Sequence, residues 1–176
     1  AQAHVIWRQA LVIGLSVFAA VIVELTLLSR LGLPGATPDI VIVTVVAIAL
    51  AMGPVQGATA GFAAGVLVDL APPGDTLLGV NAIIYLAIGF VTGFVIDPRD
   101  RTVPVVIGIV GLSAAAATLA TAALDTLLGS SRVSWEQMPG MVLTSALYAV
   151  VMAPLIVPAI AWVVRRATPE VSVISG

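Results

Sequence analysis

Six polar side chains interrupt long apolar stretches of this sequence, and they are the residues that could do chemistry. Inside a membrane, carboxylates carry protons or cations or make polar contacts, and placing one there costs about 2.5–3.5 kcal/mol. The six are Glu24, Asp39, Asp69, Asn81, Tyr85 and Asp125. We treat them as candidate functional residues within or at the border of a membrane.

Three readings of the carboxylates are open. A proton or cation pathway is disfavoured, because no row of protonatable groups crosses the middle of the apolar runs. A polar contact near the outer surface, such as Asp69 with Asn81 or an arginine, is the second, and a solvated position without a special role is the third. Glu24, Asp69 and Asp125 fall near the C-terminal ends of their expected helices, where the helix dipole disfavours negative charge, so we do not expect them to act as caps.

Motifs of known enzyme classes are missing from the sequence. It has no nucleophile elbow, no phosphate-cradling glycine loop and no zinc-binding helix motif. There is no cysteine, and the lone His4 lies outside the apolar runs. We therefore expect no catalytic residues, no metal site and no cofactor.

The composition predicts a membrane protein. The 176 residues are 60% hydrophobic and 9% charged, with a mean hydropathy of +1.18. Soluble domains carry about 25% charged residues, which cover their surface, so this chain needs lipid as part of its solvent. The chain has seven basic and nine acidic residues, for a formal net charge of −2. It therefore lacks the positive charge that attracts the phosphates of nucleic acids.

Six apolar runs predict an all-α, polytopic integral membrane fold with six transmembrane helices. We expect a single domain over residues 1–168 and a short polar tail over 169–176. The first run, 10–28, is longer than the apolar core of a signal peptide, so we read it as a spanning helix. The other expected helices cover 39–52, 54–70, 78–96, 103–128 and a segment that follows a Ser134–Gln137 capping box and ends near residue 164.

The second expected helix, 39–52, is short. We expect Thr37 as its cap, Pro38 at its first position and Asp39 in its first turn. At 1.5 Å per residue it spans about 21 Å, less than the roughly 30 Å of a bilayer core. The hairpin that it forms with the third helix either crosses a thinned membrane or re-enters it behind neighbouring helices.

The arginines predict the orientation. With six crossings and the N-terminus inside, five arginines lie on the cytoplasmic side and two on the outer side, which favours an N-in, C-in arrangement. The inner ones are Arg8, Arg99, Arg101, Arg165 and Arg166, and the outer ones are Arg30 and Arg132.

Small residues recur every fourth position on three expected helices, which places them along one face of each. Helices in lipid associate where small side chains let their backbones approach closely. The simple interpretation is that these faces pack against other helices of the same chain, and the functional interpretation is that one of them binds a helix of another protein. The stripes are Gly57, Gly61 and Gly65, leading to Asp69; Gly89 and Gly93, preceded by Asn81 and Tyr85; and Ser113, Ala117 and Thr121, leading to Asp125.

The middle of the chain carries motifs in a characteristic order. They are Pro38-Asp39, Gly53-Pro54, Gly57, Gly61-Phe62, Gly65, Asp69-Leu70, Pro73, Leu78-Gly79, Asn81-Ala82 and Tyr85. Over about residues 38–97 this order resembles the central signature of the bacterial rod shape-determining MreD family.

The resemblance implies a non-enzymatic scaffold of the cell-elongation machinery in the bacterial cytoplasmic (inner) membrane. Members of that family associate with MreC and, through it, with RodA, a class B penicillin-binding protein and MreB, in support of peptidoglycan synthesis. The resemblance also implies a fold similar to the S-components of energy-coupling-factor transporters.

That similarity leaves a small-molecule binding subunit of a vitamin transporter as the alternative function. Such a protein needs a polar pocket of ligand size, which we expect Asp69, Asn81, Tyr85 and Trp135 to form toward the outer surface. An ion-coupled transporter using Asp69 or Asp125 is a third possibility.

Overall fold

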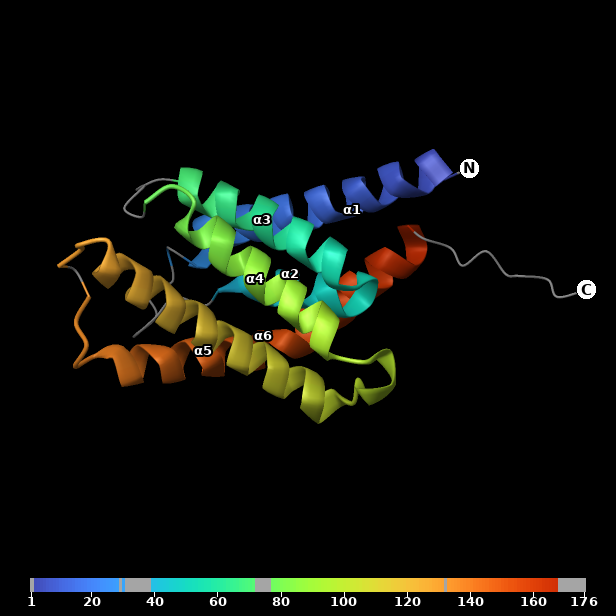
Figure 1. The fold of residues 1–176 in the computed structure, drawn as a ribbon. Coiled ribbons are helices and arrows are strands. Elements are labelled where there is room, and N and C mark those ends of the chain that lie inside the picture. Colours follow the sequence, from blue (N-terminus) through green and yellow to red (C-terminus); the bar gives the residue numbers. More distant parts are fainter. Residues whose placement is uncertain (1, 29, 31–38, 72–76, 132, 168–176) are drawn as a thin grey trace, which may run out of the picture.

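A computed structural model of the chain describes residues 2–28, 30, 39–71, 77–131 and 133–167. The described residues form six α-helices and two short helical turns and contain no strand, so the all-α prediction is confirmed (Figure 1). The elements are α1 (Gln2–Val23), the π-helical turn η1 (Glu24–Leu28), α2 (Ile40–Met52), α3 (Pro54–Leu70), α4 (Val80–Val95), the 3-10 turn η2 (Pro98–Asp100), α5 (Val103–Leu127) and α6 (Met138–Ala167).

Helix α2 is the centre of the bundle. All ten residues from Val41 to Leu50 are buried, and α2 contacts each of the other five α-helices. Its sequence, IVIVTVVAIALAM, is apolar on every side, as a helix without a solvent-facing stripe must be. Because neighbouring helices shield it, α2 does not itself have to match the thickness of a bilayer.

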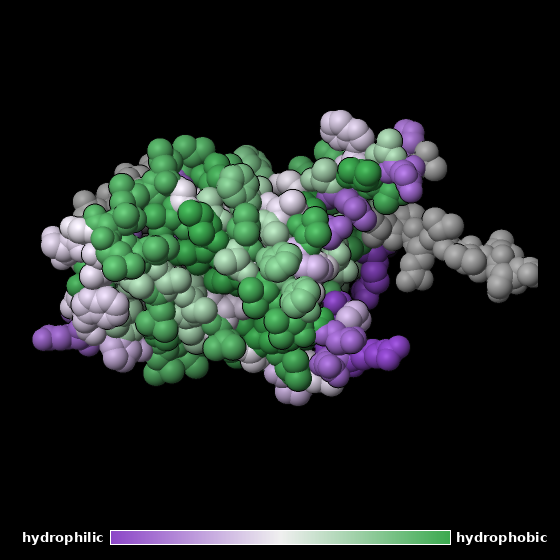
Figure 2. All heavy atoms as spheres, viewed as in Figure 1, coloured by the Kyte–Doolittle hydropathy of each residue, from purple (hydrophilic) through white to green (hydrophobic). Residues whose placement is uncertain are grey.

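The outer surface of the bundle is apolar. Phe94, Leu112 and Leu155 expose 73%, 72% and 71% of their surface, and Figure 2 shows hydrophobic residues covering most of the visible face between the two ends of the bundle. Three helices are long and apolar enough to cross a membrane, namely Gln2–Thr26, Val103–Leu127 and Met138–Ala167. The chain is therefore a membrane protein with at least three candidate spans in its described part.

Successive helices run in opposite directions, so the beginning of α1 and the end of α6 lie at the same end of the bundle (Figure 1). The connections between α2 and α3 and between α4 and α5 also lie at that end. The end of α3, the beginning of α4, the end of α5 and the beginning of α6 lie at the opposite end.

The predicted helix bounds agree closely for the middle of the chain and fail at the two ends. Helix α3 begins at Pro54 and ends at Leu70, as predicted. Helix α1 begins at Gln2 instead of residue 10, and its first two turns, which include Arg8, are exposed. The predicted capping box is wrong: α6 begins at Met138, and Ser134 accepts only the backbone N–H of Gln137 in a preceding turn.

The glycine stripes of α3 and α4 pack against each other and make the most extensive contact between any two helices. A Cβ atom added to Gly57 would lie 2.5 Å from the carbonyl oxygen of Gly89, and one added to Gly93 would lie 2.6 Å from Cα of Pro54. A Cβ on Gly61 would meet the backbone carbonyl of Tyr85. These glycines let two backbones touch, which confers close van der Waals packing in lipid.

Gly61→Ala should destabilise the fold, because its methyl group meets the Tyr85 carbonyl and α3 must move away from α4. Overpacking of this kind costs about 1–3 kcal/mol. Unfolding in a detergent titration with sodium dodecyl sulfate measures the loss. Gly108→Ala in α5 is the matched control, since nothing lies within 4 Å of its added Cβ, and it should be neutral or gain up to about 1 kcal/mol. Equal shifts for both variants would contradict the assigned contact.

Candidate functional site

Asp69 joins the end of α3 to the beginning of α4. Its side chain is 3% exposed and accepts hydrogen bonds from Nδ2 of Asn81 at 2.9 Å and from the backbone N–H of Gly79 at 2.8 Å. The N–H of Ala82 lies 3.4 Å from the same carboxylate. The predicted contact between Asp69 and Asn81 is confirmed. Because the first N–H groups of α4 have no partner within their own helix, a carboxylate here also satisfies the positive end of the helix dipole.

Asp39 caps α2 from the position before its first residue. Its Oδ1 accepts the N–H of Ile42 at 2.9 Å, and its Oδ2 accepts the hydroxyl of Tyr85 at 2.8 Å. Asp39 is thus the N-cap itself, two residues after the predicted cap Thr37, and Thr37 and Pro38 lie outside the described residues. The bond to Tyr85 ties the beginning of α2 to α4.

Glu24 reaches the same helix end from the first helix. It is the first residue of the π-helical turn η1, and its Oε2 accepts the N–H of Val41 at 3.1 Å. The expectation that Glu24 and Asp69 are not caps is therefore wrong. Each sits at the end of its own helix, as predicted, but caps the N-terminus of a neighbour, where the dipole favours negative charge.

A polar cavity of about 380 Å³ opens beside these caps, between α5, the segment before α6 and the beginning of α2. Four of the predicted candidates line it: Glu24, Asp39, Tyr85 and Asp125. Their elements lie far apart in the sequence and meet only in the folded bundle. The other polar lining residues are Thr118, Thr121, Ser134, Gln137 and Ser145.

Two of these lining residues were missed by the sequence reasoning. Thr118 donates to Oγ of Ser145 at 3.0 Å and to the carbonyl of Ala114, and so joins α5 to α6 at the cavity wall. The four-residue stripe drew attention to Ala117 and Thr121 instead. Spacings of three and four residues together place Thr118 on the same face as Thr121 and Asp125, which is the signal that could have found it.

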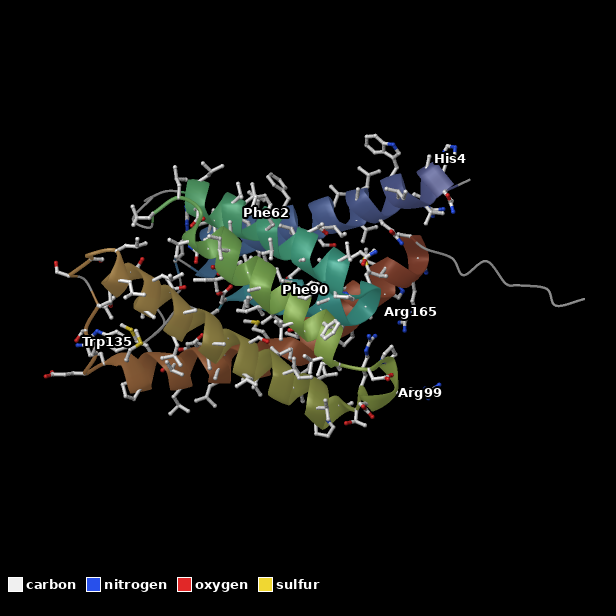
Figure 3. The ribbon with its side chains drawn as sticks, in the orientation of Figure 1. His4, Phe62, Phe90, Arg99, Trp135 and Arg165 are labelled. Atoms are coloured by element: carbon white, nitrogen blue, oxygen red, sulfur yellow. The ribbon has the colours of Figure 1, made fainter. Side chains whose placement is uncertain are left out.

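The pocket predicted for the alternative function does not form as expected. Tyr85 lines the cavity, but Asp69 and Asn81 are engaged with each other and with the beginning of α4. Trp135 lines a different, mostly apolar hollow against α5 and α6, with Leu119 and Leu143. Figure 3 shows Trp135 at the end of the bundle opposite Arg99 and Arg165.

The chemistry of the cavity follows from its lining. Three carboxyl groups and several hydroxyl groups favour an occupant that is positively charged or rich in hydrogen-bond donors. Among the described residues, no group of three or more His, Asp or Glu side chains is arranged to hold a metal ion.

Comparisons of the chain with models of protein families, with curated proteins and with solved structures find no match.

The carboxylate of Asp69 should matter for stability far more than an exposed one. Asp69→Ala leaves the buried Asn81 amide and the Gly79 N–H without their acceptor, which should cost about 3 kcal/mol of unfolding free energy. Asp100→Ala, in an exposed turn, should stay within about 0.5 kcal/mol. In a double-mutant cycle with Asn81→Ala, a coupling of about 1 kcal/mol is expected. Strictly additive losses would contradict a direct interaction.

Proposed function

We propose that this chain is a scaffold of the MreD type in the bacterial cytoplasmic membrane. In this proposal it crosses the membrane six times with both ends inside, has a fold similar to the S-components of energy-coupling-factor transporters, and performs no turnover of its own. It associates with MreC and, through MreC, with RodA, a class B penicillin-binding protein and MreB.

One observation carries the proposal: the residues of the signature hold the chain's own helices together. Gly57, Gly61 and Gly65 bring α3 onto α4, and Asp69 caps α4. Tyr85, the last residue of the signature, donates to Asp39 near its beginning. A signature used in this way specifies a rigid helical unit, which supports a structural role.

The distribution of charge supports the proposed orientation. His4, Arg99 and Arg165 lie at one end of the bundle, and Trp135 lies at the other (Figure 3). In the bilayer, positively charged ends face the cytoplasm and aromatic residues mark the interface.

The surface that best fits a partner's transmembrane helix is the groove between α4 and α5. The glycine stripes of α3 and α4 are used within the chain, so they are not available for docking. The groove has a volume of about 310 Å³ and is lined by small and apolar residues, among them Ala87, Thr92, Ser113 and Ala116. Small side chains allow a helix to approach closely, and we assign this groove to the transmembrane helix of MreC.

Filling the groove should weaken that association. Ala116→Phe places a ring where the partner helix would lie, and we expect MreC recovered with the detergent-solubilised protein to fall about tenfold, which equals about 1.4 kcal/mol. Ala19→Phe is the control, because Ala19 is exposed on α1, away from the groove. Undiminished recovery with a correctly folded Ala116→Phe protein would contradict docking at α4 and α5.

The polar cavity favours a second candidate, a small-molecule binding subunit. Its volume of about 380 Å³ falls within the range of ligand sites, and its carboxylates predict a cationic or donor-rich ligand.

Mass spectra of the protein purified in mild detergent test this second candidate. We expect an additional small organic molecule on the wild-type protein, its loss in Asp125→Asn, and its retention in Asp100→Asn. Asp125 lines the cavity, whereas Asp100 lies in the exposed turn η2. Repeated absence of any bound molecule from the wild type would count against this function and leave the scaffold proposal unaffected.

A further inference from the structure

Arg101 is held in an unusual position at the arginine-rich end of the bundle. It follows the exposed turn η2 and precedes α5, yet its side chain is half-buried. Its Nε atom is buried and, among the described residues, has no hydrogen-bond partner. Buried donors in proteins are nearly always paired, so this guanidinium nitrogen retains an unmet hydrogen-bonding capacity.

The nearest carboxylate in sequence before the turn is engaged elsewhere. Asp97 accepts the backbone N–H of Arg99 at 3.0 Å and caps η2. Asp100 is exposed within that turn. Arg101 is half-buried, whereas Arg99, Arg165 and Arg166 at the same end are exposed.

Arg101 lines a groove between α5 and α6 that is otherwise apolar. The groove has a volume of about 180 Å³, and it is formed on α5 by Val103, Val106 and Ile107 and on α6 by Ala153, Pro154, Val157 and Pro158. The α6 side of the groove is lined by short or cyclic side chains, which leave space above the helix. An apolar groove with one guanidinium in its lining matches a ligand with a hydrocarbon chain and an anionic head.

The depth of the groove matches the border of the membrane. Trp162 is 52% exposed and lies one turn beyond Pro158 on the same side of α6. Arg166 lies over its ring, with the guanidinium carbon 4.6 Å from the ring centre. Tryptophan side chains are enriched at the level of the lipid headgroups. We therefore place the groove just below the headgroups, on the hydrocarbon side, and Arg101 at the border between the two regions.

We propose that this groove binds one anionic phospholipid, with its phosphate on Arg101 and the beginning of an acyl chain along α5 and α6. Guanidinium binds phosphate through two parallel hydrogen bonds, and a small rotation of the side chain presents Nε and one terminal nitrogen to the headgroup. Arg99, Arg165 and Arg166 at the same end add a field that favours an anionic over a zwitterionic lipid. The proposal does not depend on the function proposed above.

Quenching of Trp162 by brominated lipids tests the site in the full chain. A background with Trp7→Phe and Trp135→Phe leaves Trp162 as the single tryptophan. The protein is placed in vesicles that contain brominated phosphatidylglycerol or phosphatidylcholine with identical acyl chains. We expect phosphatidylglycerol to associate about fivefold more strongly, the effect of about one arginine near a charged headgroup.

Two matched pairs of variants and one competition experiment separate the site from general surface charge. Arg101→Gln should abolish the preference, whereas Arg99→Gln, in the exposed turn, should keep it. Val157→Phe should lower quenching by both lipids because it fills the groove, and Val151→Phe, exposed on the same helix, should not. Inorganic phosphate should not displace phosphatidylglycerol at equal concentration, since it lacks a chain for the groove.

Each opposite result overturns the proposal. Equal association of the two lipids with the wild type would remove the anionic site. An equal loss of the phosphatidylglycerol preference in Arg101→Gln and Arg99→Gln would show that the preference comes from the general positive charge of this end and not from a site at Arg101. Unchanged quenching in Val157→Phe would remove the acyl chain from the groove, and displacement by inorganic phosphate would make the lipid unnecessary.

Discussion

The ends of helices inside an apolar bundle must find hydrogen-bond partners, and this requirement organises the structure. No water reaches the middle of a bilayer, so the first N–H groups of a short internal helix need acceptors from the protein. Glu24 and Asp39 supply them to α2, and Asp69 supplies them to α4. Three of the carboxylates that interrupt the apolar sequence therefore have a structural role as caps. Each joins a helix to a segment distant in the sequence, so capping also fixes the arrangement of the helices.

Close packing of α3 on α4 depends on the same part of the chain. The stripe of small residues brings the two backbones into contact, and the cap by Asp69 sets how far one helix extends past the other. Lipid tails are as apolar as leucine side chains, so contact between small residues and buried hydrogen bonds must replace the hydrophobic effect as the source of helix association. The result is a closely packed unit of α2, α3 and α4, against which α5 and α6 pack with a groove and a cavity between them.

The two ends of the bundle have different chemistry, which suits different partners. One end carries the carboxylate-lined cavity and Trp135, and the other carries the arginines of η2 and α6 (Figure 3). A partner helix at α4 and α5, a small cationic molecule in the cavity and an anionic lipid at Arg101 would each use a separate surface. These interactions can therefore be tested one at a time, since the substitutions that probe them lie on different elements.

Local sequence signals predict the helices in the middle of the chain and the faces on which their small and polar residues lie. Hydrophobic runs, Pro54 and the four-residue spacing are local signals, so α3 was predicted to the residue and Asp69 was correctly paired with Asn81. Which helix end each carboxylate caps depends on the packing of the whole bundle, since Glu24 and Val41 are 17 residues apart and no periodicity links them. The same holds for the cavity, whose lining comes from several elements, and for the groove of Arg101, formed by two helices. Spacing along one helix is set by its own geometry, whereas the choice of neighbour depends on the shapes of all six together.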